Sequence, residues 1–290
     1  MENSEIVQII SSTFASTFRL SIPLLFAALG GLFSERSGVT QIALEGLMLV
    51  GALFAAIAAY KTGFPWVGLG CGILASTILA LIKGFFVLQL KADQIVVGTA
   101  LNIFVFGFAP LLTKAAFDST GQTPAVLIYP AFHTGFILVG LFLLLIIFYI
   151  YYQTRAGLWL RFSGEAPTAL LVAGKSPKQI RYWSLMSCGA LAGFSGASLS
   201  LYLSSSYSPM MTAGRGFIAL AALIFGRWKP LPTLFICLMF GFTDALQIQL
   251  QGAETHIPAQ FIQMIPYLLT IVALAGLLGK SQAPKALGQN

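Results

Sequence analysis

The sequence predicts an all-α membrane protein that crosses the bilayer about nine times and forms one domain, residues 1–290. Of the 290 residues, 57% are hydrophobic and only 9% are charged, whereas ordinary soluble domains carry about 25% charged residues. Several stretches of roughly 20 residues are nearly free of charge, which is the length that a helix needs to cross about 30 Å of hydrocarbon. A transmembrane β-barrel would need long alternations of apolar and polar residues, and these are few, so helices are favoured.

The expected membrane segments follow from the apolar runs in order along the chain. The first run is extended by a further helical turn at 5–15. The second begins at Gly38 and the seventh at Gly214 and Gly216, so both are expected to be glycine-interrupted or half-length helices. The ranges are 16–33, 40–60, 65–89, 95–114, 135–153, 183–203, 213–227, 231–249 and 258–279.

The basic residues give the orientation, because the cytoplasmic loops of membrane proteins are enriched in Lys and Arg. Counting crossings from the most basic loop, 154–182, places the C-terminus in the cytoplasm and the N-terminus outside. The same count places 118–133 and 251–260 outside. The basic residues of the loop are Arg155, Arg161, Lys175, Lys178 and Arg181.

Stretch lengths and motif spacing argue against a separate soluble domain, an ATP-binding site and a metal or catalytic site. The longest polar stretch, 154–182, is too short to bury a core of its own, so any energy source must come from another chain. The run "GLLGKS" at 276–281 lacks the first glycine of a phosphate-binding loop, so ATP binding is not expected. The cysteines lie far apart in apolar runs, and His133 and His256 are isolated. Neither a metal, a cofactor nor a catalytic cluster is therefore expected.

The loop 154–182 contains the pattern of a short helix between basic residues. Pro167 suits the first turn and Gly174 the stop, with "TALLVA" between them. Ser176 and Pro177 then open the next membrane segment as a capping box. The short helix either lies on the membrane surface or docks into a groove of a cytoplasmic partner, and the two cap patterns favour docking.

Polar residues inside apolar segments mark a candidate pathway. A charge at the bilayer centre costs roughly 2.5–3.5 kcal/mol, so such a side chain normally faces the bundle interior or water. Gln41 and Glu45 share one helical face, Asp244 and Gln247 share another, and Asn102 lies in the fourth segment. These three segments are expected to converge on a polar route.

Structural roles for the same residues stay open as alternatives. Glu45 could pair with a cation such as Arg19 or Arg36 and lock helices together. Glu35 and Arg36 are expected at a cytoplasmic turn, in a structural or interface role. A weak internal repeat relates the Ile-Ala-Leu runs that follow Gly38 and Gly214, and paired interruptions of this kind occur at transporter pathways.

Four stretches together resemble the permease subunits of bacterial ABC importers. They are "GLFSERSGVTQIALEGLMLVGALFA" (31–55), "KADQIVVGTALNI" (91–103), "RAGLWLRFSGEAPTALLVAG" (155–174) and "GRGFIALAALIFGRWKP" (214–230). The resemblance is narrower to the branched-chain amino acid and simple-sugar permease family, in its branch for nucleoside uptake. It runs over nearly the whole chain in the same order.

This resemblance implies a type II-like permease fold in the bacterial inner membrane and a set of partners. The partners are a second related permease, two cytoplasmic ATP-hydrolysing subunits and an extracellular substrate-binding lipoprotein. In the family a "GE-x-P-x-A" pattern in the cytoplasmic loop contacts the ATPase. The matching residues here are Gly164, Glu165, Pro167 and Ala169, continuing to Gly174.

The expected function is therefore that of a transport subunit, not an enzyme, that passes a small polar solute, with nucleosides favoured. A simple sugar is the alternative, because family members often have asparagine where this chain has Gln41. An alternative from another class is a secondary transporter driven by protons or sodium, with Glu45 and Asp244 as ion sites.

Overall fold

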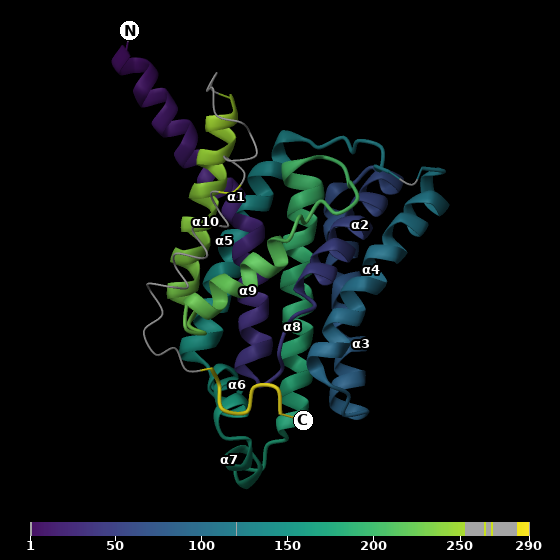
Figure 1. The fold of residues 1–290 in the computed structure, drawn as a ribbon, viewed down its shortest axis with the longest axis vertical. Coiled ribbons are helices and arrows are strands. Elements are labelled where there is room, and N and C mark those ends of the chain that lie inside the picture. The colour runs from purple at the N-terminus through teal and green to yellow at the C-terminus, as the bar shows by residue number, and fades with distance from the viewer. Residues whose placement is uncertain (1, 120, 253–263, 265–267, 269–282, 290) are drawn as a thin grey trace.

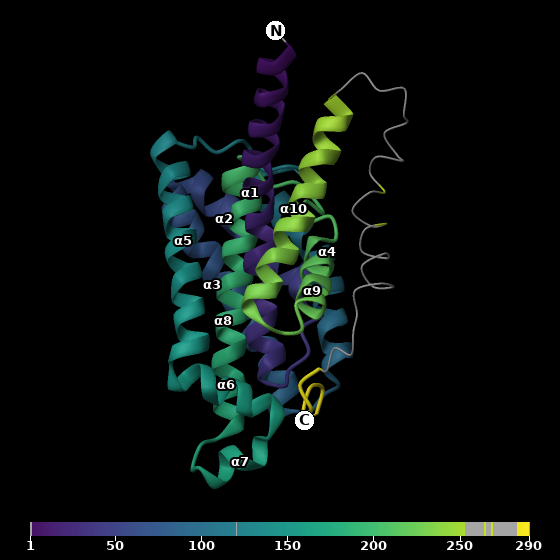
Figure 2. The same ribbon diagram turned by 90° about the vertical axis from the view of Figure 1, so that its left-hand side faces the viewer.

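The protein is a helical bundle in the computed structural model, which describes residues 2–119, 121–252, 264, 268 and 283–289 (Figures 1 and 2). Seven helices in this described part are long and apolar enough to cross a membrane, namely α1, α2, α3, α4, α5, α8 and α10. The elements are α1 (Glu2–Arg36), α2 (Leu44–Thr62), α3 (Pro65–Gly84), η1 (Phe85–Gln89), α4 (Gln94–Phe117), α5 (Pro130–Gln153), α6 (Arg155–Glu165), α7 (Pro167–Val172), α8 (Pro177–Ala197), η2 (Ser198–Leu203), α9 (Arg215–Phe225) and α10 (Pro230–Gly252).

The count of crossings differs from the expected nine. Each of the first eight apolar runs contains a helix, but α9 has only 11 residues, about 16 Å of rise, which is half a bilayer. The ninth run, 258–279, falls almost entirely outside the described residues. The second run is the full-length helix α2, with 19 residues.

Of the three glycines expected to interrupt helices, Gly38 and Gly214 lie before a helix, and Gly216 is the second residue of α9. Gly38 occupies the connection between α1 and α2 with φ +100°, and Gly214 directly precedes α9 with φ +80°. Both angles belong to the left-handed region that favours glycine. The interruptions are therefore connections, each followed by the start of a helix.

The centre of the bundle is formed by α1, α2 and α8, with α3 packed on α2 and α8 and with α10 packed on α1. Close approach depends on small residues. A Cβ at Gly196 would lie 2.0 Å from the Met48 carbonyl oxygen, and one at Gly193 would lie 2.7 Å from Ile73 Cα. The Gly189–Gly193–Gly196 row of α8 therefore serves helix packing, as its spacing predicts.

The two ends of the bundle are different in structure (Figure 1). The N-terminus lies at one end, and α6, α7 and residues 283–289 lie at the other. At the N-terminal end the connections 118–129 and 204–214 are joined: the Thr123 amide donates to the Tyr207 carbonyl (3.0 Å), and the Val126 amide donates to the Ser205 carbonyl (2.8 Å). Burial raises the pKa of Tyr207 to about 12, so its hydroxyl stays neutral.

Candidate functional site

The centre of the candidate site is the non-helical connection 37–43 between α1 and α2, here called the α1–α2 junction. Most of its residues are buried, and Gly38 and Gln41 lie in its middle. Non-helical backbone at membrane depth is tolerated only where its polar groups find partners inside the protein. In this junction side chains from five surrounding elements supply those partners.

One helix, α4 (Gln94–Phe117), holds the second half of the junction. Gln94 Oε1, at the start of α4, accepts from the Thr40 amide (2.8 Å) and from its hydroxyl (3.0 Å). Asn102, also on α4, donates to the Ile42 carbonyl (3.0 Å) and accepts from the Gly46 amide (2.9 Å). Asn102 thus fixes the start of α2 to α4, and it is 4% exposed.

Gln41 is fully buried and lies at the junction's most polar point. Its Oε1 accepts a hydrogen bond from Lys83 Nζ of α3, and its Nε2 donates to Cys188 Sγ of α8 (3.0 Å). Lys83 also donates to the Thr40 carbonyl and is itself 0% exposed. The Gln41 amide donates to Glu35 (3.2 Å). Both polar atoms of the Gln41 side chain therefore form a hydrogen bond within the protein.

Glu35 and Arg36 join the end of α1 to the turn between α9 and α10. Glu35 is 4% exposed, and its Oε2 accepts from Trp228 Nε1 (2.6 Å). Arg36 Nε donates to the Trp228 carbonyl (2.6 Å), and Arg36 forms an ion pair with Glu165 at the end of α6 (3.2 Å). The structural role expected for both residues is confirmed, although Glu35 is buried rather than at an exposed turn.

Residues 283–289, here called the C-terminal tail, close the junction from the end of the bundle that carries α7. The Gly288 amide donates to the Gly38 carbonyl (3.1 Å), and the Ala286 amide donates to the Gly164 carbonyl (2.8 Å). Arg181 of α8 donates to the Ser37 carbonyl (3.2 Å) and to the Gln289 carbonyl (3.0 Å). The tail therefore connects the junction, α6 and α8.

Glu45, 1% exposed, binds the start of α9 (Arg215–Phe225) with both carboxylate oxygens. It accepts from the Gly214 amide (2.8 Å) and from the Gly216 amide (2.7 Å). A helix N-terminus carries a partial positive charge and unpaired amides, which a carboxylate satisfies. Gly216 has no room for a side chain, because a Cβ there would lie 2.5 Å from the Glu45 nitrogen.

The partner of Glu45 is not the cation, Arg19 or Arg36, that the locking alternative named. Arg19 donates to the Tyr202 carbonyl (3.5 Å), and Arg36 pairs with Glu165. The partners of Glu45 are backbone amides, which no sequence pattern displays. The glycines on either side of Arg215 are the sequence feature that indicates such a contact, since helix starts that bind an anion are often rich in glycine.

Asp244 and Gln247 lie apart from this cluster. Both are half-buried on α10, which packs against α1 and α9. The charged neighbour of Asp244 is Arg215, at the start of α9. The structure therefore brings Gln41, Glu45 and Asn102 together around the start of α2, whereas Asp244 lies on α10, which packs on α1 and α9. None of these five residues lines the cavity between α5, α6 and α8.

The short helix predicted in the loop is confirmed as α7, which projects beyond the bundle (Figures 1 and 2). Pro167 is its first residue, and Gly174, with φ +73°, follows it. Leu170 is buried, whereas Leu171 and Val172 are 60% and 91% exposed. Ser176 precedes α8 as expected, but its side chain makes no capping hydrogen bond. The predicted capping box is therefore wrong in detail.

The root of α7 is tied at three points to the junction and to Arg36, the residue of α1 that directly precedes it. Ser163 donates to the Ser37 carbonyl (3.0 Å), and Glu165 pairs with Arg36. Gly164 lies directly against Arg36, since a Cβ there would be 2.3 Å from the Arg36 carbonyl oxygen. Ala169 is exposed on α7. A force on α7 therefore reaches the junction through short, direct contacts.

Several contributors around the junction were not anticipated from the sequence, namely Lys83, Gln94, Ser163, Arg181, Trp228 and the C-terminal tail. Lys83 gave a usable signal, since a lone charge inside an apolar run is expensive unless it has a buried partner. Arg181 was counted only among the basic residues of the loop, but it is 8% exposed and bonded to the junction.

Sequence similarity to known proteins extends over nearly the whole chain. Residues 13–274 match the family model described as the permease component of branched-chain amino acid transport systems. The guanosine ABC transporter permease protein NupQ of Bacillus subtilis is 33% identical over 98% of this chain and 97% of its own. The nucleoside ABC transporter permease protein NupC of Lactococcus lactis is 33% identical over 98% of both chains. The putative glucose ABC transporter permease protein TsgC13 of Haloferax volcanii is 30% identical over 90% of this chain and 89% of its own.

Proposed function

The chain belongs to the family of branched-chain amino acid transport permease components, and from that premise we propose that it is the membrane subunit of an ATP-driven importer of nucleosides. Family membership makes it a multi-pass transport subunit that works in a complex with ATPase and further permease chains. Nucleosides are favoured because two relatives with 33% identity are named for guanosine and nucleoside transport. A simple sugar is the second candidate, because a relative with 30% identity is named for glucose.

The observation that carries this function is the geometry of α7. Its exposed Leu171 and Val172 have no covering segment among the described residues, and its root is fixed to the α1–α2 junction by Glu165 and Ser163. An exposed apolar face at the tip of a basic loop suits a groove on a partner. The contacts at its root suit the transmission of movement.

The mechanism follows the contacts inward from α7. ATP binding closes the two ATPases and displaces α7 with the end of α6. The Arg36–Glu165 pair and Ser163 carry this displacement to the junction and to Trp228. Glu45 then moves the start of α9, because its carboxylate holds two amides of that helix. Alternating access results from this movement, and the permease itself catalyses no reaction.

The solute pathway runs beside α2, α4, α9 and α10. Gln41, Glu45 and Asn102 form its inner wall and set the position of α2, whereas Asp244 and Gln247 are the polar groups on α10 that the solute meets. Selectivity is left largely to an extracellular substrate-binding lipoprotein. A second related permease completes the pathway from the other side.

The end of the bundle with α6, α7 and the C-terminal tail faces the cytoplasm in this proposal. The basic residues of the loop support that orientation, since positive charge is retained on the cytoplasmic side. The N-terminus and the connection 118–129 then face the outside, where a binding protein delivers the solute.

Co-purification with the ATPase tests the coupling role, with a matched pair of variants. Val172→Asp on α7 and Leu127→Asp at the opposite end both place a charge at a strongly exposed apolar residue, 91% and 81% exposed. Val172→Asp is expected to remove the ATPase from the purified complex, and Leu127→Asp to leave it. Glu165→Lys and Ala169→Trp are expected to act as Val172→Asp does. Equal ATPase yields for the matched pair would exclude α7 as the docking element.

Uptake into proteoliposomes distinguishes the classes of transporter and of substrate. The reconstituted complex, with its binding protein, is given guanosine, free bases and pentoses in turn. Uptake that requires ATP on the side of the membrane where α7 lies, and that does not depend on an ion gradient, supports the proposal. Uptake by the lone chain that collapses with a proton or sodium gradient would establish a secondary transporter. Uptake of pentoses alone would show that the substrates are sugars and not nucleosides.

A further inference from the structure

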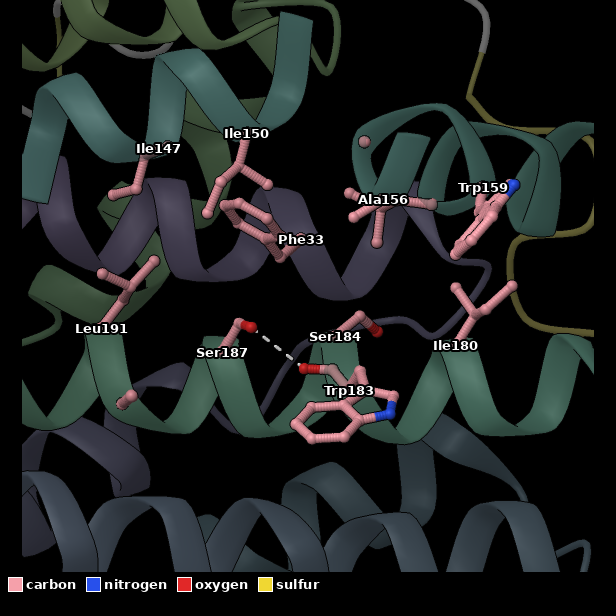
Figure 3. A pocket seen from close by; sticks show the side chains of 13 residues that line it. Phe33, Ile147, Ile150, Ala156, Trp159, Ile180, Trp183, Ser184, Ser187 and Leu191 are labelled. Carbon is pink, nitrogen blue, oxygen red and sulfur yellow. Dashed lines mark hydrogen bonds between the residues drawn. The ribbon is translucent and has the colours of Figure 1, made fainter. Parts of the chain in front are cut away.

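A cavity of about 540 Å³ opens between α5, α6 and α8, with α1 as its floor (Figure 3). It is separate from the α1–α2 junction. The side chains that decide its chemistry are Phe33, Ile150, Trp159, Ile180, Trp183 and Leu191. Its size falls within the range of roughly 300–1,000 Å³ that small-molecule sites occupy.

The hollow arises because α5 (Pro130–Gln153) packs differently along its two halves. Near the N-terminal end of the bundle, Phe136 stacks on Phe194 of α8 with ring centroids 4.6 Å apart. Near the other end, α6 turns back tightly on α5, since a Cβ at Gly157 would lie 2.3 Å from the Ile150 carbonyl oxygen. The small Ala156 and Ala190 then leave the space between α6 and α8 open.

The cavity offers no free polar group to a ligand among its lining hydroxyls. Ser187 donates to the Trp183 carbonyl of its own helix (3.0 Å), as the dashed line in Figure 3 marks. Ser184 donates to the Arg181 carbonyl (2.8 Å) and shares a hydrogen bond with Ser37 (2.6 Å). A polar solute would lose its hydration there without replacement, so the cavity suits hydrocarbon.

The dimensions of the cavity match one leaflet of a bilayer. Its lining on α8 runs from Ile180 to Leu191, and eleven residues of helix rise about 16 Å. Half of the hydrocarbon thickness of a bilayer is about 15 Å. The cavity thus extends from the membrane surface beside α6 to near the midplane, along the path of one acyl chain.

The mouth of the cavity carries positive charge and tryptophan. Lys175 Nζ lies 4.7 Å from the centroid of the Trp159 ring, which lines the cavity. Arg155 is exposed one turn before Trp159 on α6, on the same helical face. Trp183 is 68% exposed at the rim. Tryptophan and basic residues are the side chains that hold lipid headgroups at the interface.

We propose that this cavity is a binding site for an anionic phospholipid, with one acyl chain between α5 and α8 and the phosphate beside Lys175 and Arg155. The leaflet is the cytoplasmic one, a detail that rests on the orientation proposed above. The bound lipid fills the hollow at the root of α6 and keeps that root packed against α8.

Quenching of tryptophan fluorescence by brominated lipids tests the site in the purified transporter complex. The complex is placed in phosphatidylcholine nanodiscs that contain a minor fraction of either phosphatidylglycerol or phosphatidylcholine with brominated acyl chains. The signal of Trp159 is obtained as the difference from Trp159→Phe. Brominated phosphatidylglycerol is expected to quench Trp159 at a mole fraction at least about fivefold lower than brominated phosphatidylcholine, because each basic residue at a membrane surface contributes about that factor.

Three variants make the outcome decisive. The double variant Lys175→Gln with Arg155→Gln is expected to abolish the headgroup preference, whereas Lys178→Gln, a basic residue of the same loop that is bonded to Gln89 (2.6 Å), keeps it. Ala190→Leu, which fills the cavity, is expected to lower quenching by both lipids. Equal quenching by the two lipids, or no response to Ala190→Leu, would overturn the proposal. Protection of Trp159 from both lipids in the complex, but not in the free permease, would show that a partner helix covers the cavity instead. None of these readouts depends on nucleoside uptake or on ATP.

Discussion

The bond between Glu45 and the start of α9 predicts a large loss of stability in Glu45→Leu. The carboxylate holds the Gly214 and Gly216 amides at 2.8 and 2.7 Å and is 1% exposed. Leucine accepts no hydrogen bond, and each amide left unsatisfied in a buried site costs about 1–3 kcal/mol. The two together give a loss of about 2–6 kcal/mol. At roughly 2 °C per kcal/mol for a chain of this size, the melting temperature is expected to fall by at least about 4 °C.

A thiol-reactive fluorescent dye measures this transition, because Cys188 and Cys237 are fully buried and become reactive only on unfolding. Asp93→Leu is the matched control. The Asp93 carboxylate also accepts from two amides, Ile95 (2.9 Å) and Val96 (2.9 Å), but in an exposed position where water replaces it. The control is expected to lose about 1 kcal/mol, as an ordinary N-cap does. If Glu45→Leu melts no lower than Asp93→Leu, the bond to α9 does not stabilise the fold as argued.

Three further variants test neighbouring contacts with the same dye. Gly216→Ala places a Cβ 2.5 Å from the Glu45 nitrogen and should lower the melting temperature. The double variant with Glu45→Leu should lose less stability than the sum of the two single variants, because both disrupt one contact. Full additivity would show that the two residues act independently. Asn102→Leu leaves the Gly46 amide and the Ile42 carbonyl without their partner and is expected to cost about 2–6 kcal/mol, so a melting curve that matches the unmodified protein would contradict the role of Asn102. Ser176→Ala should change stability by less than about 0.5 kcal/mol, because the side chain makes no capping bond, and a loss near 1 kcal/mol would reveal one.

The sequence predicted features that depend on local chemistry. Long apolar runs defined the membrane helices, and Pro167 and Gly174 defined the start and the end of α7, because proline and glycine restrict or free the backbone at their own positions. The same reasoning overestimated Ser176, since a capping residue type does not ensure that its side chain turns toward the helix.

Contacts between distant segments were beyond such reasoning. The partners of Glu45 are amides about 170 residues away, and every residue except proline carries an amide, so no letter in the sequence marks them. Lys83 could be recognised in the sequence as a charge inside an apolar run. Its partners, the Thr40 carbonyl and the side-chain oxygen of Gln41, could not. The sequence predicted that polar residues gather inside the membrane segments, but it did not predict their hydrogen-bond partners.

The docking of residues 283–289 has a consequence for biosynthesis. Gly38 and its hydrogen-bond partner Gly288 are about 250 residues apart, and a ribosome that adds about 5–20 residues per second needs roughly 12–50 s to cover that distance. During this interval α1 and α2 are already made, while the backbone between them still lacks its final donors. Until residues 283–289 are made, the Gly38 carbonyl must accept from another donor, such as water.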